Sequence, residues 1–500
     1  MFRAEIRNEI EKIVPGSTVF SVERPENPEH GDYSSNVALV LAKKEGRNPK
    51  EVAEEIKKAL GNLVSKWIEK IEVAGPGFLN FWIKKEALIL ALKKPLKLKT
   101  EKKFKINLEF VSANPTGPLT MANGRGGFYG DALANVLKAA GHKITREYYI
   151  NDTGNQIKLL GESILAAAGK IPQKDEYYKG AYIKKLKDKS AEATVKILLG
   201  EIKKSLKKAG IKFDVWFSEA GMHKKGELKK TLEFLNKKKI LKEGEGALWL
   251  GDAVVVKSNQ ELTYFLADLA YHYDKFIKRK FDLAINIWGA DHHGYVERME
   301  KGIEALGVSP ERLKIIIMQL VRLTSGGKEV KMSKRAGEFI TLDDLVKEVG
   351  VGAARWFFLE RSPDTHMDFD LDLAKERSKK NPVYYVQYAH ARACSILRKS
   401  KVSKISNLQL LTQPEELNLI KKILQLPEII EDIAKDYQIH RLPRYAYELA
   451  KTFADFYEKH KVIDEKKPDL TKARLALVLA TQKTTKTTLS LMGIDSPKKM

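Results

Sequence analysis

Alternating apolar and polar positions near residue 110 predict a strand, a loop, a helix and a second strand in succession. From 104 to 110 apolar side chains occupy every second position, which is typical of a strand. The next segment, 112–119, holds two prolines and a glycine and is predicted to be a loop. A helix is expected from about 123 to 140, stopped by Gly141, and a strand from 144 to 150.

This succession is a βαβ unit, which places the loop at the carboxyl end of its first strand. Nucleotides bind at that edge of parallel sheets, and the N-terminus of the helix offers free N–H groups to phosphate. The chain has no Walker-type phosphate loop, and Gly124-Arg125-Gly126-Gly127 lacks the spacing of the dinucleotide fingerprint. The pattern therefore predicts a nucleotide site of another kind.

A second candidate for phosphate chemistry is Lys331-Met332-Ser333-Lys334, which follows a glycine-rich turn and precedes a helix capped at Thr341. Two lysines three positions apart can stabilise the β- and γ-phosphates of ATP while the α-phosphate is attacked. A solvated basic loop is the plain alternative, because the chain holds 89 Lys and Arg residues. Whether this motif indicates a nucleotide site therefore depends on the βαβ unit upstream.

Taken together, these motifs resemble the class I aminoacyl-tRNA synthetases, and within them the arginyl-tRNA synthetase family. Residues 109–156, which begin Glu-Phe-Val-Ser-Ala-Asn-Pro-Thr-Gly-Pro-Leu, are similar to the first half of that family's catalytic domain. Residues 288–295 (Trp-Gly-Ala-Asp-His-His-Gly-Tyr) resemble its nucleoside-binding segment, and 331–339 resemble its second signature. Segments 381–392 and 496–500 also match, so the resemblance covers nearly the whole chain.

The resemblance implies an arginine–tRNA ligase. Such an enzyme activates L-arginine with Mg-ATP, giving arginyl-adenylate and pyrophosphate, and then transfers arginine to the 3′-terminal ribose of its tRNA. It also implies that bound tRNA is needed for the first step, that the enzyme is a monomer, and that no cofactor is tightly bound. The alternative is a degenerate synthetase paralogue that binds tRNA without activating an amino acid.

The fold implied is α/β, with a Rossmann-like catalytic domain between two accessory domains. An N-terminal α+β module is predicted over 1–92 and joins the catalytic domain through a lysine-rich linker at 93–103. The catalytic domain is expected over 104–376, with a helical insertion near 160–240 and the lysine loop at 331–335. An all-α anticodon-binding domain is predicted over 377–500.

The resemblance also implies an arginine site. Glu109 and Asp268 would hold the cationic groups of the substrate, Tyr264 would pack on its aliphatic stem, and Asn114 would hold its polar head. Ser112 is a further member of the arginine-binding set. Tyr264 and Asp268 are four apart and share a face if their segment is helical. The strand alternation does not decide which face of the sheet Glu109 occupies, so an exposed strand-end acid remains an alternative. A surface helix acid is the corresponding alternative for Asp268.

For ATP, the resemblance implies binding residues on three segments. The catalytic members are Thr120, Asn123, Lys331 and Lys334. The full set is Thr120, Asn123, Gly124, Gly289, Asp291, His292, Lys331, Met332, Ser333 and Lys334.

The first signature departs from the family pattern. Thr120-Met121-Ala122-Asn123 stands where the family usually carries His-(Ile/Val)-Gly-His. Threonine and asparagine can hydrogen-bond phosphate or ribose oxygens, but they cannot carry a positive charge. The methyl of Ala122 is also expected to crowd adenine where glycine would not. We expect an active enzyme in which the lysine loop supplies the cationic role.

Contacts with tRNA are expected in both accessory domains. In the N-terminal module Asn36 is the candidate for a base contact at the tRNA elbow, with a turn or helix cap as an equal alternative. In the C-terminal domain aromatic residues interleave with basic ones, a composition that suits stacking on unpaired bases. Most of these aromatics are expected in a helical core, and the resemblance selects Tyr388, Tyr445 and Met500 as anticodon contacts.

Composition agrees with a polyanionic partner and argues against other classes. The net charge is +24, although a lysine-rich proteome would produce the same value. Cys394 is alone, which excludes an intrachain disulfide and a cysteine-based zinc site. Asp291-His292-His293 suits a metal ligand set and makes a metal hydrolase the runner-up enzyme class, but no further cluster completes the sphere. No apolar run has membrane-spanning length and no targeting peptide is recognised, so a cytoplasmic protein is expected.

Overall fold

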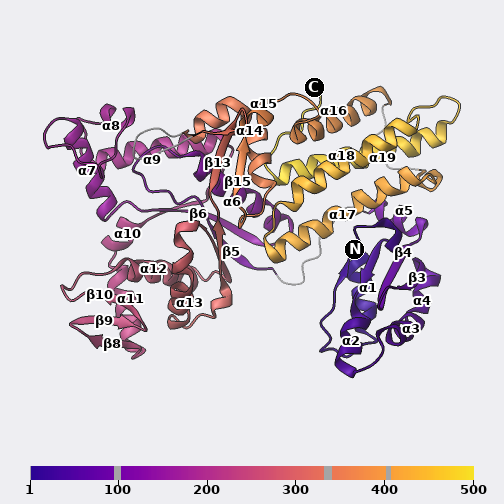
Figure 1. Ribbon diagram of the computed structural model, residues 1–500, viewed down its shortest axis with the longest axis horizontal. Helices are drawn as coiled ribbons and strands as arrows, with labels where there is room; N and C mark the ends of the chain where they lie inside the picture. Colours follow the sequence, from indigo (N-terminus) through magenta and orange to yellow (C-terminus); the bar gives the residue numbers. More distant parts are fainter. Residues whose placement is uncertain (1, 95–102, 331–339, 401–406) are drawn as a thin grey trace.

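The computed structural model describes residues 2–94, 103–330, 340–400 and 407–500 (Figure 1). The predicted lysine loop, with Lys331, Met332, Ser333 and Lys334, lies outside these residues. So does most of the predicted linker, which is bracketed by the end of one helix at Lys93 and the start of a strand at Lys105.

A parallel sheet of order β12-β11-β5-β6-β7 forms the centre of the catalytic domain. Its strands are β5 (Lys105–Glu109), β6 (Lys143–Ile150), β7 (Val215–Ser218), β11 (Leu283–Gly289) and β12 (Leu313–Met318). The predicted βαβ unit is confirmed, because β5 and β6 are parallel neighbours joined by a helix. The order changes direction at β5, so the carboxyl ends of β5 and β11 meet at the switch point where ligands bind.

The helix of this unit, α6 (Met121–Ala139), packs on the sheet at very short range. A Cβ added to Gly130 would lie 2.3 Å from Cγ of Phe110, so the backbone of α6 can approach the sheet only because glycine stands there. The helix ends as predicted before Gly141, which adopts a φ of 99°. This contact sets the height of the helix N-terminus above the sheet.

The predicted insertion near 160–240 is helical at first but differs from the prediction further on. Its helices are α7 (Asn155–Ala167), α8 (Ala181–Lys185), α9 (Ala191–Lys208), α10 (Glu219–Lys224) and α11 (Glu227–Lys237). Strand β7 lies among them and pairs with β6, so part of the segment belongs to the main sheet. Every residue of β7 is half-buried, so the strand has no alternation that would reveal it in the sequence.

The remaining elements between residues 241 and 375 form two further sheets and the helices beside them. An antiparallel sheet of β8 (Leu241–Gly244), β9 (Ala247–Leu250) and β10 (Ala253–Val256) precedes α12 (Tyr264–Tyr273), which continues into a π-helical turn, Asp274–Lys278. A 3-10 turn, Ala290–Tyr295, and α13 (Val296–Ala305) follow β11. A third sheet, β14-β13-β15, is formed by β13 (Val321–Ser325), β14 (Lys328–Glu329) and β15 (Met367–Asp370). It packs with α14 (Leu342–Leu359) and α15 (Leu371–Lys375).

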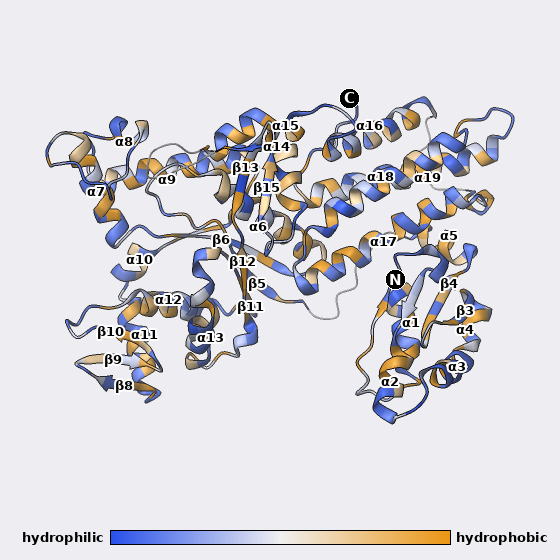
Figure 2. Cartoon of the chain, viewed as in Figure 1, coloured by the Kyte–Doolittle hydropathy of each residue, from blue (hydrophilic) through white to orange (hydrophobic). Residues whose placement is uncertain are grey.

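The two ends of the chain form the predicted accessory domains. The N-terminal module has the sheet β1-β2-β4-β3. Its elements are α1 (Phe2–Glu11), β1 (Val22–Glu23), β2 (Tyr33–Ser35), α2 (Val37–Glu45), α3 (Pro49–Ala59), α4 (Gly61–Lys66), β3 (Ile68–Ala74), β4 (Phe78–Ile83) and α5 (Lys85–Lys93). The C-terminal domain contains α16 (Pro382–Ser400), α17 (Pro414–Asp436), α18 (Arg441–Lys459) and α19 (Pro468–Leu491). These helices carry hydrophobic and hydrophilic residues side by side, as amphipathic helices around a shared core do (Figure 2).

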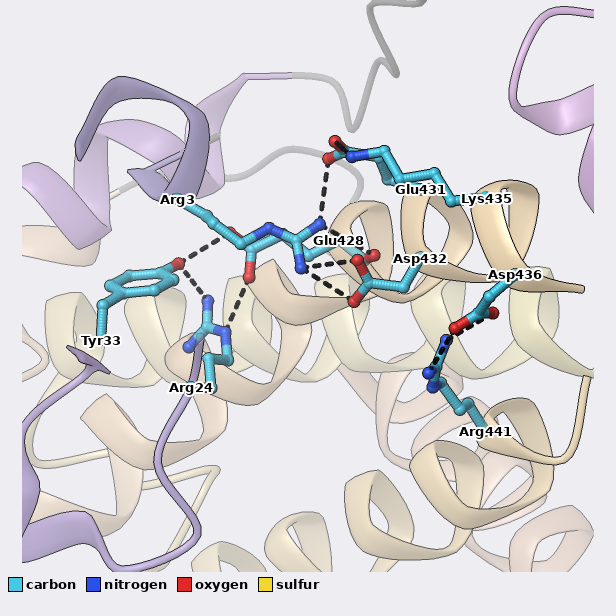
Figure 3. A network of polar contacts seen from close by, with 9 residues as sticks. All are labelled: Arg3, Arg24, Tyr33, Glu428, Glu431, Asp432, Lys435, Asp436 and Arg441. Carbon is cyan, nitrogen blue, oxygen red and sulfur yellow. Dashed lines mark hydrogen bonds and ion pairs between the residues drawn. The ribbon is translucent and has the colours of Figure 1, made fainter. Parts of the chain in front are cut away.

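A buried polar network joins the N-terminal module to helix α17 (Figure 3). The carboxylate of Glu428 accepts hydrogen bonds from Arg24 Nε at 2.8 Å and from the Tyr33 hydroxyl at 2.7 Å. Arg3 of α1 donates to Asp432 at 2.8 Å and to Glu431 at 3.1 Å. The module is thus attached directly to the C-terminal helical domain, although the two are far apart in sequence.

In the described residues no helix is both long enough and apolar enough to cross a bilayer.

The close packing of α6 gives a stability prediction. Gly130→Ala places a methyl where the Phe110 ring lies, so we expect a loss of about 1–3 kcal/mol in the free energy of unfolding. The matched control is Gly200→Ala in α9, where nothing lies within 4 Å of the added Cβ. There we expect a gain of roughly 0.5–1 kcal/mol from helix propensity. Thermal unfolding of both variants is the measurement, and equal melting temperatures would contradict the packing argument.

Candidate active site

A cleft of about 2180 Å³ opens at the carboxyl edge of the main sheet. Its walls come from the loops after β5 and β6, the N-terminal half of α12 and the turn after β11. The predicted site residues that line it are Glu109, Ser112, Asn114, Asn123, Tyr264, Asp268, Gly289, Asp291 and His292. The structure therefore brings together residues that are widely separated in sequence.

Glu109 points into the interior beside the cleft, which decides between its two predicted placements. Its side chain is buried, so it is not an exposed strand-end acid. Oε1 accepts a hydrogen bond from the Ser112 hydroxyl at 3.2 Å, and Oε2 accepts one from Lys275 Nζ at 2.7 Å. The sequence analysis did not identify Lys275. The available signal was a polar Asn286 in the middle of an otherwise apolar strand, because this asparagine also binds Lys275.

The loop after β5 is held in an unusual backbone conformation. Val111 and Ser112 adopt φ angles of 67° and 39°, which non-glycine residues seldom do, and least of all a β-branched valine. Such strain persists where the surroundings impose it and is common at functional sites. Here the Ser112 hydroxyl donates to Glu109 and accepts a hydrogen bond from the Tyr149 N–H at 3.0 Å. Further along, Asn114 Nδ2 donates to Gln156 Oε1 at 2.6 Å.

Tyr264 and Asp268 share one face of α12, as predicted, and both line the cleft. The Tyr264 side chain is 60% exposed and offers its ring to the cleft, whereas Asp268 is partly buried rather than a surface acid. The Tyr295 hydroxyl donates to Asp268 Oδ2 at 2.6 Å. Burial raises the pKa of Asp268 to about 7, and the hydrogen bond from Tyr295 opposes that rise.

Two further polar residues of the cleft were missed by sequence reasoning. Glu219, at the start of α10, is almost fully buried, and burial raises the pKa of its carboxyl while a hydrogen bond with Tyr149 opposes the rise. Tyr149, on β6, lies among the carboxylates of Glu219, Asp268 and Glu109. The cleft therefore concentrates negative charge around one tyrosine, which suits a cationic ligand.

Two residues of the altered first signature, Thr120 and Asn123, hydrogen-bond to each other at the start of α6. The backbone N–H and the hydroxyl of Thr120 both donate to Asn123 Oδ1, each at 3.0 Å. This leaves the Asn123 amide nitrogen as the donor on the cleft side, while Thr120 does not line the cleft and instead orients Asn123. Ala122 is exposed and does not line the cleft, so its methyl does not narrow it.

Gly124 has a packing role rather than a place at the cleft. A Cβ there would lie 2.8 Å from Cδ1 of Leu342, so glycine permits the close contact between α6 and α14. Its predicted contact with ATP is therefore not supported by its position. Gly289, Asp291 and His292 do lie at the cleft, on the turn after β11, with the His292 ring 5.7 Å from that of Trp288. In the described part of the chain no group of three or more His, Cys, Asp or Glu side chains is arranged to hold a metal ion.

The residues predicted to contact tRNA differ in their exposure to solvent. Tyr388 is 44% exposed and Met500 is 50% exposed, whereas Tyr445 is only 2% exposed and donates its hydroxyl to Lys422 O at 2.9 Å. The placement of Tyr445 contradicts its predicted stacking role, since its ring belongs to the helical core. Tyr447, two positions on and 42% exposed, presents a ring on the surface instead. Asn36 precedes α2 but does not cap it, because its Oδ1 accepts from the Ser21 N–H at 2.8 Å.

Comparisons with known proteins agree on one family. Family models match residues 1–83 (arginyl tRNA synthetase N terminal domain), 173–372 (tRNA synthetases class I (R), catalytic domain) and 386–500 (DALR anticodon binding domain). The chain is 44% identical to an arginine–tRNA ligase of Carboxydothermus hydrogenoformans, over 96% of this chain and 94% of the relative. Among solved structures, the arginyl-tRNA synthetase of Thermus thermophilus is similar in fold, with a TM-score of 0.83, 22% identity and full coverage of both chains. That of Plasmodium falciparum has a TM-score of 0.78 and 21% identity, covering 100% of this chain and 98% of that one.

Burial of Asp268 gives a pH-dependent stability prediction that needs no ligand. An aspartate in an unfolded chain ionises near pH 4, roughly. In the folded protein, by contrast, the pKa of Asp268 is about 7, so stability is lost as the pH rises between these values. The rise in pKa from 3.8 to about 7 corresponds to about 4 kcal/mol.

The variant Asp268→Asn removes this ionisation while keeping the shape of the side chain. We expect it to match the parent protein near pH 4 and to exceed it by about 2–4 kcal/mol near pH 8, measured by denaturant unfolding of the unliganded protein. Asp175→Asn, at a fully exposed acid, is the control and should change stability little at any pH. A stability difference for Asp268→Asn that does not vary with pH would contradict the burial argument.

Proposed function

The chain belongs to the arginyl-tRNA synthetase family, and we propose which of its residues carry out the family's reaction. It is a class I arginine–tRNA ligase, similar over nearly its whole length to arginine–tRNA ligases, and its substrates are ATP, arginine and the cognate tRNA. We propose in addition that ATP acts as its Mg²⁺ complex, that the enzyme is a monomer, and that it works in the cytoplasm.

The arginine site lies between β5 and α12. Glu109 and Asp268 reach the same cleft from different elements, and this convergence of two carboxylates is the observation that carries the assignment. Carboxylates in a partly buried site are the natural partners of a planar guanidinium. The exposed ring of Tyr264 covers the aliphatic stem of the substrate, and Ser112 and Asn114 hold its polar head.

The nucleotide binds beside α6. Asn123 offers its amide N–H groups to phosphate or ribose oxygens, Thr120 orients Asn123, and the N-terminus of α6 adds its positive dipole end. Gly289, Asp291 and His292 contact the adenosine. Lys331 and Lys334, with Met332 and Ser333 between them, stabilise the leaving pyrophosphate. These four residues lie outside the described part of the chain, so the motif alone supports their roles.

The chemistry proceeds in two displacements. A carboxylate oxygen of arginine attacks the α-phosphorus of ATP in line, the bond to the β-phosphate breaks, and pyrophosphate leaves. The terminal ribose hydroxyl of tRNA then attacks the carbonyl carbon of arginyl-adenylate, loses its proton, and AMP leaves. Positioning and electrostatic stabilisation account for the rate in such a scheme, and no covalent intermediate with the protein is required.

The tRNA is contacted through both accessory domains. We assign Tyr388 and Met500 to the anticodon, and we add Tyr447 in place of the buried Tyr445. The N-terminal module contacts the tRNA elbow, where Asn36 remains the candidate for a base. The described network between Glu428, Arg24 and Arg3 holds these two tRNA-binding surfaces at one separation.

ATP–pyrophosphate exchange tests the assigned arginine site. We expect exchange with arginine in the presence of cognate tRNA, and none with lysine or tryptophan. Asp268→Asn removes a charge-assisted interaction worth about 1.5–3 kcal/mol, so its KM for arginine should rise about 10- to 100-fold with the KM for ATP unchanged. Exchange absent under every condition, with tRNA still bound, would favour the paralogue that binds tRNA without activating an amino acid.

A second prediction concerns the anticodon-binding domain. Tyr388→Ala removes an exposed ring that can stack on a base, so the KM for tRNA should rise about 5- to 100-fold, corresponding to about 1–3 kcal/mol. Aminoacylation kinetics at saturating arginine provide the measurement. Tyr445→Phe is the matched control, because it removes only a buried hydrogen bond to Lys422 O; it should lower the melting temperature and leave the KM for tRNA unchanged.

A further inference from the structure

A fully buried lysine lies directly behind Glu109. Lys275 belongs to the π-helical turn that continues α12, and its side chain has no exposure to solvent. Its ammonium donates to Glu109 Oε2 at 2.7 Å and to Asn286 Oδ1 at 2.9 Å, and it lies 4.1 Å from the centre of the Tyr271 ring. Lys275 does not line the cleft, so it meets a ligand only through Glu109.

This lysine is the end of a chain of hydrogen bonds with fixed direction. The His272 ring has its Nδ1 2.8 Å from Asp268 O, a carbonyl that can only accept, so Nδ1 carries the proton. His272 Nε2 must then accept, and it does so from Asn286 Nδ2 at 3.0 Å. The amide of Asn286 is thereby oriented with its oxygen toward Lys275. Burial lowers the pKa of His272 to about 3, so the ring stays neutral and this arrangement holds at neutral pH.

A contribution to folding stability does not by itself explain the buried ion pair between Lys275 and Glu109. Replacing a buried ion pair by apolar residues of similar size is often neutral or stabilising, because two charges lose their hydration on burial. Bulges of the π-helical kind are also frequent at functional sites. What the pair does provide is a carboxylate with one oxygen held from behind and the other beside Ser112, at the wall of the cleft.

The need for such a partner follows from the charges around Glu109. Asp268 and Tyr271 of α12 and Tyr149 of β6 interact electrostatically with Glu109, and Glu147 of β6 is its neighbour on the adjacent strand. Glu219 of α10 acts on Asp268, and His272 lies beside Lys275. Glu147 is already engaged by the Tyr271 hydroxyl and by Arg279. Asp268 and Glu219 are like charges, which disfavour a further carboxylate in the same site. Lys275 is the cation in direct contact with Glu109 in the described structure.

We propose that Lys275 is a positioning residue for arginine recognition, which holds the Glu109 carboxylate at the wall of the cleft and fixes its orientation toward the substrate guanidinium. This inference rests on the proposed role of Glu109 in binding arginine. Lys275 touches the lining of the cleft at Glu109, so its removal should affect the binding of arginine and not that of ATP or tRNA. His272 and Asn286 serve the same end by holding the ammonium in place.

The test is the kinetics of Lys275→Met, in which the KM for arginine, the KM for ATP and kcat are measured separately by tRNA-dependent ATP–pyrophosphate exchange. Without its ammonium partner, the Glu109 carboxylate is no longer held toward the substrate guanidinium. We expect the KM for arginine to exceed that of the parent enzyme about 10- to 100-fold, with kcat and the KM for ATP within twofold.

Lys278→Met is the matched control. This lysine lies on the same turn but is paired with Glu227 away from the cleft, and its replacement should leave the arginine KM unchanged. Melting temperatures of both variants show whether the fold is retained. A raised arginine KM in Lys275→Met that is accompanied by an equal rise in the KM for ATP, or by an equal loss of kcat, would mean a general structural role and would overturn the proposal.

A double-substitution cycle with Glu109→Gln separates this proposal from the one on which it rests. If Lys275 acts through Glu109, Lys275→Met should cause no further loss of arginine affinity in a Glu109→Gln background. If Glu109→Gln itself leaves the arginine KM unchanged, the assigned arginine site is at fault rather than the role of Lys275. If both substitutions raise the KM and their effects multiply, Lys275 acts by another route and the proposal fails.

Discussion

The buried ion pair between Asp131 of α6 and Arg355 of α14 is the interaction on which the arrangement of the domains depends. One guanidinium nitrogen of Arg355 donates to Asp131 at 2.9 Å and to Met492 O, just after α19, at 3.0 Å. The other donates to the carbonyl of Gly210, just after α9, at 2.9 Å. A single buried side chain therefore joins helix α6, the insertion and the C-terminal domain. Loss of Asp131 would leave the buried guanidinium of Arg355 without the carboxylate that it contacts.

Helix α6 makes further contacts along its length, with the cleft at its N-terminus and with the C-terminal domain further on. Its N-terminal turn carries the Thr120–Asn123 pair at the cleft. Further along, the Tyr129 hydroxyl donates to Tyr437 O, and Asn135 Nδ2 donates to Leu491 O at 3.1 Å, both in the C-terminal domain. The same element thus positions Asn123 at the cleft and is anchored to the C-terminal helices, so the two regions cannot shift independently of it.

The two carboxylates assigned to arginine have partners of different charge. Glu109 has a buried ammonium behind it, whereas Asp268 is held by a neutral tyrosine hydroxyl, and burial raises its pKa to about 7. The charge of Glu109 is therefore compensated before any ligand arrives, and that of Asp268 is not. A cationic substrate would relieve the unfavourable burial of Asp268, which makes the site less stable empty than filled. This difference between Glu109 and Asp268 would be lost if both acids were paired with lysine.

The sequence by itself determined the local elements and the order of the motifs. Apolar positions predicted β5 and β6, Gly141 marked the end of α6, and the capping residue Thr341 marked the start of α14, because these signals depend on neighbouring residues alone. Only the tertiary structure decided that β7 completes the main sheet and that Glu109 faces the cleft. It also showed that Tyr447, rather than Tyr445, lies on the surface and that Lys275 lies behind Glu109. The physical reason is that strand pairing, burial and ion pairing are contacts between distant segments, and a local pattern carries no information about which distant segment will supply the partner.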